Sequence, residues 1–183
     1  MKSSKLTREE IYQLEEWTSL ECSEVLFNSK QDNWSKNTSE FGQKVLNKSN
    51  LIFLVEDTNA NKFGYYFSKQ VNQTGSYITD PNSFIFSLKN NGRIIEGNGM
   101  MKFEAKGSNG QLYVGSRPSE ELFCLTNNWG IYILKENLKS RSFCSQNESH
   151  FDYHGIQNAL VGTTYGSYDS QFTPKRIVVI QMK

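Results

Sequence analysis

The sequence has almost no net charge, because 20 Lys and Arg residues stand against 19 Asp and Glu residues and leave +1. Such a balanced chain gives no electrostatic reason to expect nucleic acid, an anionic membrane or an acidic substrate as a partner. No segment approaches the roughly 20 apolar residues of a transmembrane helix. The polar start MKSSKLTREE also lacks the apolar core of a signal peptide. We therefore expect a soluble, cytoplasmic protein that inserts into no membrane.

Cysteine is scarce, and Cys22, Cys124 and Cys144 are odd in number and widely spaced, which does not predict a disulfide framework. Phe and Leu flank Cys124, so we expect a small buried side chain there. Acidic neighbours should raise the pKa of Cys22 and make its thiol less reactive. Cys144 follows Arg141 by three residues and is the best candidate for a reactive thiol. No CxxC pair or glycine-rich nucleophile turn accompanies it.

Histidine is rarer still, with only two residues in the chain. Together with Cys144, His150 and His154 give the spacing C-x5-H-x3-H, and Cys124 is a distant fourth candidate ligand for zinc. A zinc finger also needs a C-x2-4-C pair, which is missing. If the segment is extended, the two histidines lie roughly 13 Å apart at about 3.3 Å per residue, too far to share an ion. We expect two partly exposed loop histidines and no bound metal or cofactor.

Helical signals are few. Thr7 and Glu10 form a capping box, and Ile11, Leu14 and Trp17 follow at three-residue steps on one helix face. We expect residues 1–16 to form this N-terminal helix and residues 17–183 to form the domain itself. A second helix is predicted over about 38–47, with Phe41, Val45 and Leu46 on its buried face.

Strand signals dominate the rest of the chain. A short strand is predicted at 25–27, and the apolar runs 51–55 and 177–180 are typical of strands buried on both faces. Residues 83–88 alternate between Phe or Leu and smaller side chains, which predicts a half-buried strand. Asn91-Gly92 predicts a type I′ hairpin, and Asn127-Asn128 a second one. The pattern indicates a single α+β domain that is mainly β. Its 12 Phe, 9 Tyr and 3 Trp residues are expected to fill the core and not to stack on nucleic acid.

The stretch EDTNANKFGYY raises the question of calcium. Asp57, Asn59 and Asn61 fall at alternate positions, as the first three ligands of an EF-hand loop do. The loop would need Gly at its sixth position and Glu at its twelfth, and Lys62 and Ser68 occupy those places. Because both flanks are strand-like, we interpret the stretch as a hairpin turn. On this interpretation, Asp57→Ala should change stability little.

The same hairpin resembles the core of a TLDc domain. The matching segments are SNLIFLVEDTNANKFGYYFSKQV and SYITDPNSFIFSL, flanked by EVLFNSKQDNWSKNTSEFGQKVLNKS, NWGIYIL, HGIQNALVGTTY and FTPKRIVVIQM, so that the resemblance covers roughly residues 17 to 182. The closing strand is similar to that of protist members, whereas animal members often end it in Glu-apolar-Trp. Protist members often carry a coiled coil upstream, and the N-terminal helix is consistent with the remnant of one. The family-motif positions, expected to be structural, are Phe63, Gly64, Tyr65, Ser83, Phe84, Phe86 and Leu88.

The resemblance implies a two-sheet antiparallel β-sandwich flanked by a few helices. It also implies a role in oxidative-stress protection, or in regulation of the vacuolar proton pump (V-ATPase) by binding to its cytosolic sector. The family has no agreed catalytic residues, so we expect a non-catalytic domain that docks on a protein partner, with loop aromatics such as Trp34 or Tyr168 as anchors. The alternative is a metal- or thiol-dependent enzyme that uses Cys144, His150 and His154, or a calcium sensor built on the Asp57 loop.

Overall fold

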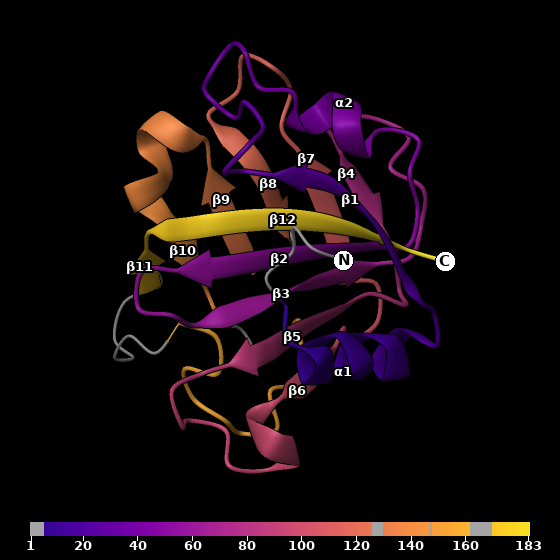
Figure 1. The fold of residues 1–183 in the computed structure, drawn as a ribbon, viewed down its shortest axis with the longest axis vertical. Helices are drawn as coiled ribbons and strands as arrows, with labels where there is room; N and C mark the ends of the chain where they lie inside the picture. Colours follow the sequence, from indigo (N-terminus) through magenta and orange to yellow (C-terminus); the bar gives the residue numbers. More distant parts are fainter. Residues whose placement is uncertain (1–5, 126–129, 147, 162–169) are drawn as a thin grey trace.

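Two antiparallel six-stranded sheets form the protein (Figure 1), in a computed structural model that describes residues 6–125, 130–146, 148–161 and 170–183. Sheet A has the order β1 (Cys22–Asn28), β12 (Pro174–Met182), β2 (Leu51–Asp57), β3 (Lys62–Phe67), β5 (Phe84–Lys89) and β6 (Met101–Glu104). Sheet B has the order β11 (Ser170–Phe172), β10 (Ser142–Cys144), β9 (Ile131–Leu134), β8 (Glu121–Leu125), β7 (Gln111–Val114) and β4 (Tyr77–Thr79). The predicted mainly β fold with two antiparallel sheets is confirmed.

The centre of sheet A is buried on both faces, as the two apolar runs predict. In β2, Phe53 and Val55 point into the space between the sheets, whereas Ile52 and Leu54 belong to a separate cluster on the outer face. The neighbouring β12 divides its side chains in the same way. Because both faces exclude water, every position of these strands favours an apolar residue, which explains the unbroken hydrophobic runs.

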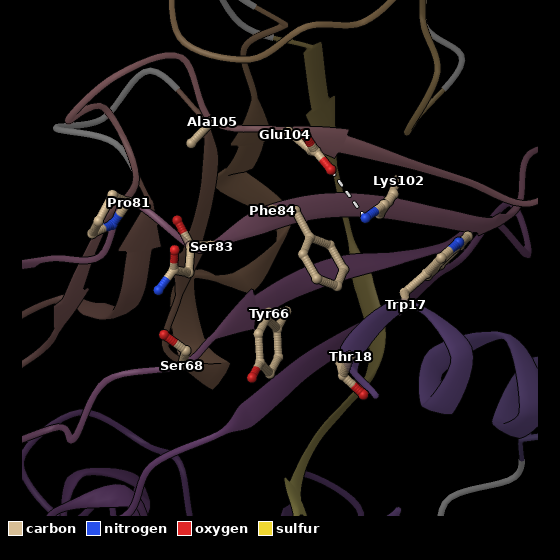
Figure 2. A pocket seen from close by; sticks show the side chains of 11 residues that line it. Trp17, Thr18, Tyr66, Ser68, Pro81, Ser83, Phe84, Lys102, Glu104 and Ala105 are labelled. Carbon is tan, nitrogen blue, oxygen red and sulfur yellow. Dashed lines mark ion pairs between the residues drawn. The ribbon is translucent and has the colours of Figure 1, made fainter. Parts of the chain in front are cut away.

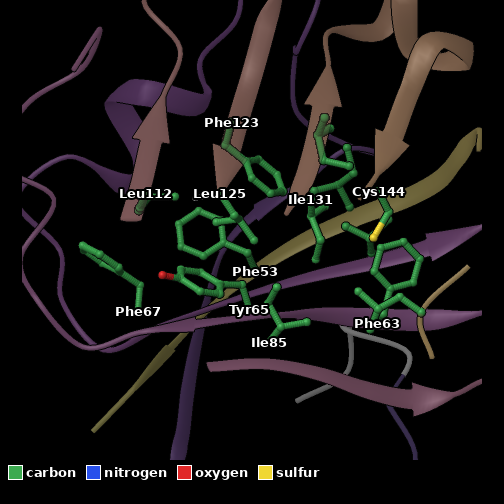
Figure 3. Close-up of a cluster of buried hydrophobic side chains, with 14 of the residues drawn as sticks. Phe53, Phe63, Tyr65, Phe67, Ile85, Leu112, Phe123, Leu125, Ile131 and Cys144 are labelled. Atoms are coloured by element: carbon green, nitrogen blue, oxygen red, sulfur yellow. The ribbon is translucent and has the colours of Figure 1, made fainter. Parts of the chain in front are cut away.

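Aromatic rings fill the space between the sheets (Figure 3). Phe53 of sheet A meets Phe123 of sheet B with ring centroids 5.1 Å apart. Phe41, from the short helix α2 (Phe41–Val45), stacks on Phe123 at 5.6 Å and closes one end of the core. Each such ring removes roughly 150–250 Å² of surface from water, so the aromatic content of the sequence serves the sandwich interior.

Helix α1 (Arg8–Thr18) covers the outer face of sheet A (Figure 1). The predicted capping box is present, because the Glu10 backbone N–H donates to Thr7 Oγ1 and the Thr7 N–H donates to the Glu10 carboxylate. Leu14 is fully buried in the outer cluster, and Trp17 packs edge-on against Phe84. Lys62 Nζ lies 2.7 Å from Glu10 Oε1, so an ion pair with little exposure ties the start of the helix to β3.

The prediction of a half-buried strand at 83–88 is wrong, because β5 is buried on both faces. Phe84, Phe86 and Leu88 face α1 in the outer cluster, while Ile85 points into the core between the sheets. The side chains of this strand alternate in size, but they do not alternate in exposure to solvent. A helix from the start of the chain covers the face that would otherwise meet water, and no pattern within the strand itself reveals it.

The second helix is shorter than the predicted span of 38–47. Before it, Ser39 Oγ accepts a hydrogen bond from the Phe41 N–H, and Thr38 Oγ1 contacts Asn33 Oδ1, so these side chains hold a turn in place of a helical start. After it, the cap residue Leu46 is extended, with a ψ of 138°, so the helix ends at Val45, and Asn47 follows with a φ of 62° in the left-handed region. Phe41 and Val45 are buried as predicted, and Leu46 is partly exposed.

The two predicted asparagine turns have different outcomes. Asn91 and Gly92 do adopt positive φ, at 55° and 85°. The segment after them does not return as a strand, because Ile94 enters the core and the next strand, β6, begins only after a 3-10 turn, η1 (Gly97–Gly99). The second turn lies between β8 and β9, which pair as the predicted hairpin, although residues 127 and 128 lie outside the described residues. A longer 3-10 segment, η2 (Glu136–Arg141), follows β9.

Among the described residues, no helix is long and apolar enough to cross a bilayer.

Candidate functional site

The Asp57 pattern forms the turn between β2 and β3, which pair in antiparallel register, so the predicted hairpin is confirmed. Asp57 has no solvent exposure. Its Oδ1 accepts hydrogen bonds from the backbone N–H groups of Asn59 (2.9 Å) and Asn61 (2.8 Å), and its Oδ2 accepts one from Asn61 Nδ2 (2.6 Å). The carboxylate oxygens that a calcium ion would need are therefore engaged by donors of the turn itself.

Arg93 supplies a positive charge beside this turn. Its Nη2 donates to Asn61 Oδ1 at 2.9 Å and to the Leu160 carbonyl at 3.1 Å, and its Nε donates to the Asn158 carbonyl at 2.6 Å. Asn91 Nδ2 also donates to Asn61 Oδ1, at 2.9 Å. The polar side chains thus join the β2–β3 turn to two distant segments. This network is structural, and it reverses the expectation that Asp57→Ala costs little.

The three thiols are poorly placed for chemistry. Cys144, the best candidate from the sequence, is only 3% exposed in the core, and burial raises the pKa of its thiol to about 12. Burial also raises the pKa of Cys124, with a further contribution from Glu121. For Cys22, burial and, to a smaller extent, the charge of Glu15 raise the pKa of the thiol to about 11. The direction of the shift is the predicted one, but the acid that contributes belongs to α1 and is not one of the adjacent residues in the sequence. Only the thiolate is a strong nucleophile.

We expect native protein at pH 8 to react very slowly with a disulfide reagent such as Ellman's, because a thiol of pKa 11 is ionised in about one molecule in a thousand at that pH. The three cysteines should all react at once after unfolding in guanidinium chloride, which serves as the control. One rapidly reacting equivalent in the native state would contradict this burial and restore the thiol-enzyme alternative. A Cys144→Ala variant would then identify the residue.

Among the described residues, the two histidines are not part of a metal-binding group. His154 Nδ1 is 3.6 Å from Asp152 Oδ1 at an exposed position, and His150 Nδ1 is 3.0 Å from Ser149 Oγ. Burial lowers the pKa of His150. Within the described ranges, no group of three or more His, Cys, Asp or Glu side chains is placed to hold a metal ion. The sequence pattern with Cys144 is thus not assembled in space.

The family-motif positions occupy the adjacent strands β3 and β5 and the turn before β5. Phe63 and Tyr65 point into the core, and Gly64 lies opposite Phe86 in the register. Ser83 Oγ donates to the Asp80 carbonyl at 2.7 Å and holds the turn that begins β5. Their placement, buried and engaged in packing, is that of structural residues.

Of the two aromatic anchors suggested by the sequence, Trp34 is 4% exposed and belongs to the core, with Lys139 Nζ 5.6 Å from its ring centroid, so it is not a surface anchor. Tyr168 lies outside the described residues.

A groove of about 430 Å³ lies on the outer face of sheet A, beside the end of α1 (Figure 2). Its floor follows one cross-strand row, in which Tyr66 of β3 pairs with Phe84 of β5 and Phe84 pairs with Glu104 of β6. The Tyr66 and Phe84 rings lie 5.0 Å apart, and Trp17 forms a wall. The other lining residues are mostly polar: Thr18, Ser68, Pro81, Asn82, Ser83, Lys102 and Ala105.

The groove carries one charge of each sign. Lys102 Nζ lies 3.0 Å from Glu104 Oε1 and 5.5 Å from the centroid of the Phe84 ring. Figure 2 marks the ion pair with a dashed line. Both side chains leave the same face of β6, two residues apart, because strand residues alternate between faces. The result is an aromatic floor with a polar rim and no net charge, a composition typical of protein-binding surfaces. No local pattern in the sequence predicts this groove, since its parts come from four segments.

The structure is a two-sheet sandwich with a polar-rimmed groove on the outer face of sheet A. The family model of the TLDc domain matches residues 2–173, which include α1, every strand of both sheets except β12, and the groove. The chain therefore belongs to the TLDc domain family. A comparison with curated proteins gave no match.

Proposed function

We propose that this chain is a cytoplasmic, non-catalytic regulatory domain of the TLDc family, of the protist type. It acts by docking on a protein partner, the cytosolic sector of the vacuolar proton pump, and the other role that the resemblance implies is resistance to oxidative stress. Membership of the TLDc family supports a protein-interaction role. The pump and the stress response come from the resemblance of the sequence to that family.

The observation that carries the docking proposal is the groove beside α1. Interfaces depend on a few aromatic or apolar anchors surrounded by polar groups that exclude water. Trp17, which is partly exposed, supplies the aromatic contact above a floor of Tyr66 and Phe84 that is itself mostly buried, and the Lys102–Glu104 pair supplies a polar rim. A partner segment with an apolar side chain and one ion-pairing group would complement it.

The state of the chemically active side chains supports a non-catalytic role. A nucleophile needs an adjacent base and a group that orients the base. Cys144 is buried and its pKa is raised, and the Asp57 oxygens are held by backbone and amide donors. These residues stabilise the fold.

The test is a titration of tagged protein against the purified cytosolic sector, following binding and ATP hydrolysis together. We expect binding that changes the rate of hydrolysis and depends weakly on salt, since the groove is neutral. Lys102→Glu should weaken binding on the order of tenfold or more by replacing an ion pair with like charges. Lys175→Glu is the matched control, because Lys175 Nζ also pairs with a glutamate, Glu56, at 2.9 Å on a distant strand.

Absence of binding at concentrations on the order of 50 µM, with unchanged hydrolysis, would remove the pump from the proposal. Binding that Lys102→Glu and Lys175→Glu weaken equally would place the docking surface elsewhere. Melting temperatures of both variants must stay near that of the wild type for the comparison to count.

A further inference from the structure

The outer face of sheet B carries an uninterrupted row of aromatic residues around one cysteine. Tyr77 of β4 pairs with Tyr113 of β7, Tyr113 with Cys124 of β8, Cys124 with Tyr132 of β9, and Tyr132 with Phe143 of β10. The neighbours of these residues along each strand point inward, as Leu112 and Val114 do on either side of Tyr113. The row therefore lies on the face turned away from sheet A. We call Tyr77, Tyr113, Cys124, Tyr132 and Phe143 the aromatic row.

The aromatic row consists of two ring pairs flanking Cys124. Tyr132 and Phe143 are stacked at 4.6 Å with 12° between their planes, and Tyr77 and Tyr113 lie 5.3 Å apart. Cys124 is 1% exposed beneath them, whereas all four aromatic residues are partly exposed.

The strands of sheet B carry a single charged residue, an acid. Glu121 is the one charged residue within the six strands of sheet B as the structure bounds them. Its Oε1 accepts a hydrogen bond from the Tyr132 hydroxyl at 2.6 Å, and among the described residues Oε2 has no hydrogen-bond partner. The nearby Lys135 does not pair with it, because its Nζ donates to three backbone carbonyls at 2.7–2.8 Å, those of Ser116, Arg117 and Ser119.

We propose that the aromatic row with Glu121 is a docking surface for an arginine-bearing segment of a protein partner, an inference that rests on the proposed docking function. The guanidinium stacks on Tyr132, whose hydroxyl donates to Glu121, and itself donates to Glu121. Tyrosine faces attract cations, and a carboxylate with an open oxygen accepts a charge-assisted hydrogen bond. A second copy of the chain is less suitable, because it would bring the same acid and no cation from its strands.

Spacing leaves room for a planar group beside Tyr132. Tyr113 and Tyr132 lie two strands apart, about 9.6 Å at the usual strand spacing. A flat group stacked between two rings needs about 7 Å, since each contact takes about 3.5 Å, so a guanidinium enters this interval and contacts one ring fully at a time. It presents its N–H donors at its edge, whereas an ammonium group cannot stack in this way.

The experiment is an NMR titration of the intact, isotope-labelled chain with the peptide acetyl-Gly-Arg-Gly-Arg-Gly-amide, compared with the same peptide carrying Lys or Gln in place of Arg. We expect amide shifts at Tyr113, Cys124 and Tyr132, with the Arg peptide bound about fivefold or more tightly than the Lys peptide. Glu121→Gln should weaken binding on the order of tenfold, the effect of one charge-assisted hydrogen bond. Glu104→Gln, the same change in the groove of sheet A, should have no effect.

Three outcomes would overturn the proposal. They are shifts confined to other surfaces, equal binding of the Gln peptide, and unchanged affinity in Glu121→Gln. Shifts of the aromatic row that depend on protein concentration without peptide would assign the face to a second copy instead. The titration contains no pump component, so its failure leaves the pump assay standing, and a failed pump assay leaves this result standing.

Discussion

Replacing Asp57 with alanine is expected to lower the free energy of unfolding by about 3 kcal/mol, although the turn looks like an ordinary surface hairpin in the sequence. The carboxylate is fully buried and accepts three hydrogen bonds, two from backbone N–H groups and one from Asn61. Each buried donor left without a partner costs about 1–3 kcal/mol. The change also removes the negative charge that offsets Arg93. Urea denaturation followed by tryptophan fluorescence measures the loss.

Asp152→Ala is the matched control for this prediction. Asp152 Oδ1 also accepts a backbone hydrogen bond within a turn, from the His154 N–H at 3.1 Å, but its side chain is about half exposed. Water can replace the lost acceptor there, so the change should stay within about 0.5 kcal/mol. Equal losses in the two variants would show that the buried network contributes nothing. A melting temperature of the wild type that rises by several degrees in millimolar calcium, and not in Asp57→Ala, would revive the calcium site.

The Asp57 turn shows how much of this region could be predicted from the sequence. A run of Asp and Asn between two strand-like segments predicts a turn because such side chains bond their own backbone, and the structure confirms it. What the pattern omits is Arg93, which lies more than thirty residues along the chain and reaches the turn only through the fold. Local chemistry predicted the conformation, and tertiary contacts determined the burial and therefore the energy.

The two candidate surfaces depend on register, which a single sequence expresses weakly. Tyr113, Cys124 and Tyr132 lie in separate strands, and they become neighbours only because β7, β8 and β9 pair with these residues opposite one another. A shift of one residue would turn every side chain to the other face. The groove likewise needs α1 to lie over β5, and that packing was not visible in the alternation of Phe84 with its neighbours.

Gly64 is the position where a single added methyl group should do the most harm to sheet A. A Cβ atom there would collide with the carbonyl oxygen of Phe53 on β2 and lie 2.6 Å from the Phe86 ring on β5. One obstacle is backbone in a central strand, and the other is a ring held in the cluster under α1, so neither can move cheaply. We expect Gly64→Ala to destabilise the protein by about 3 kcal/mol, the upper part of the usual range for overpacking, and Gly64→Val to cost more.

The sign of this effect separates it from the ordinary consequence of replacing glycine. Gly→Ala usually stabilises a helix by about 0.5–1 kcal/mol, because the unfolded chain loses freedom. Gly42 in α2 offers the matched control, since the nearest atom to its added Cβ would be a side-chain methyl of Thr74 at 3.3 Å, and the others lie at ordinary contact distance. Thermal and urea denaturation should therefore show Gly42→Ala unchanged or slightly more stable and Gly64→Ala much less stable. If both variants have the melting temperature of the wild type, β2, β3 and β5 do not approach as closely at Gly64 as this packing requires. The structural role of Gly64 as a family-motif position would then be wrong as well.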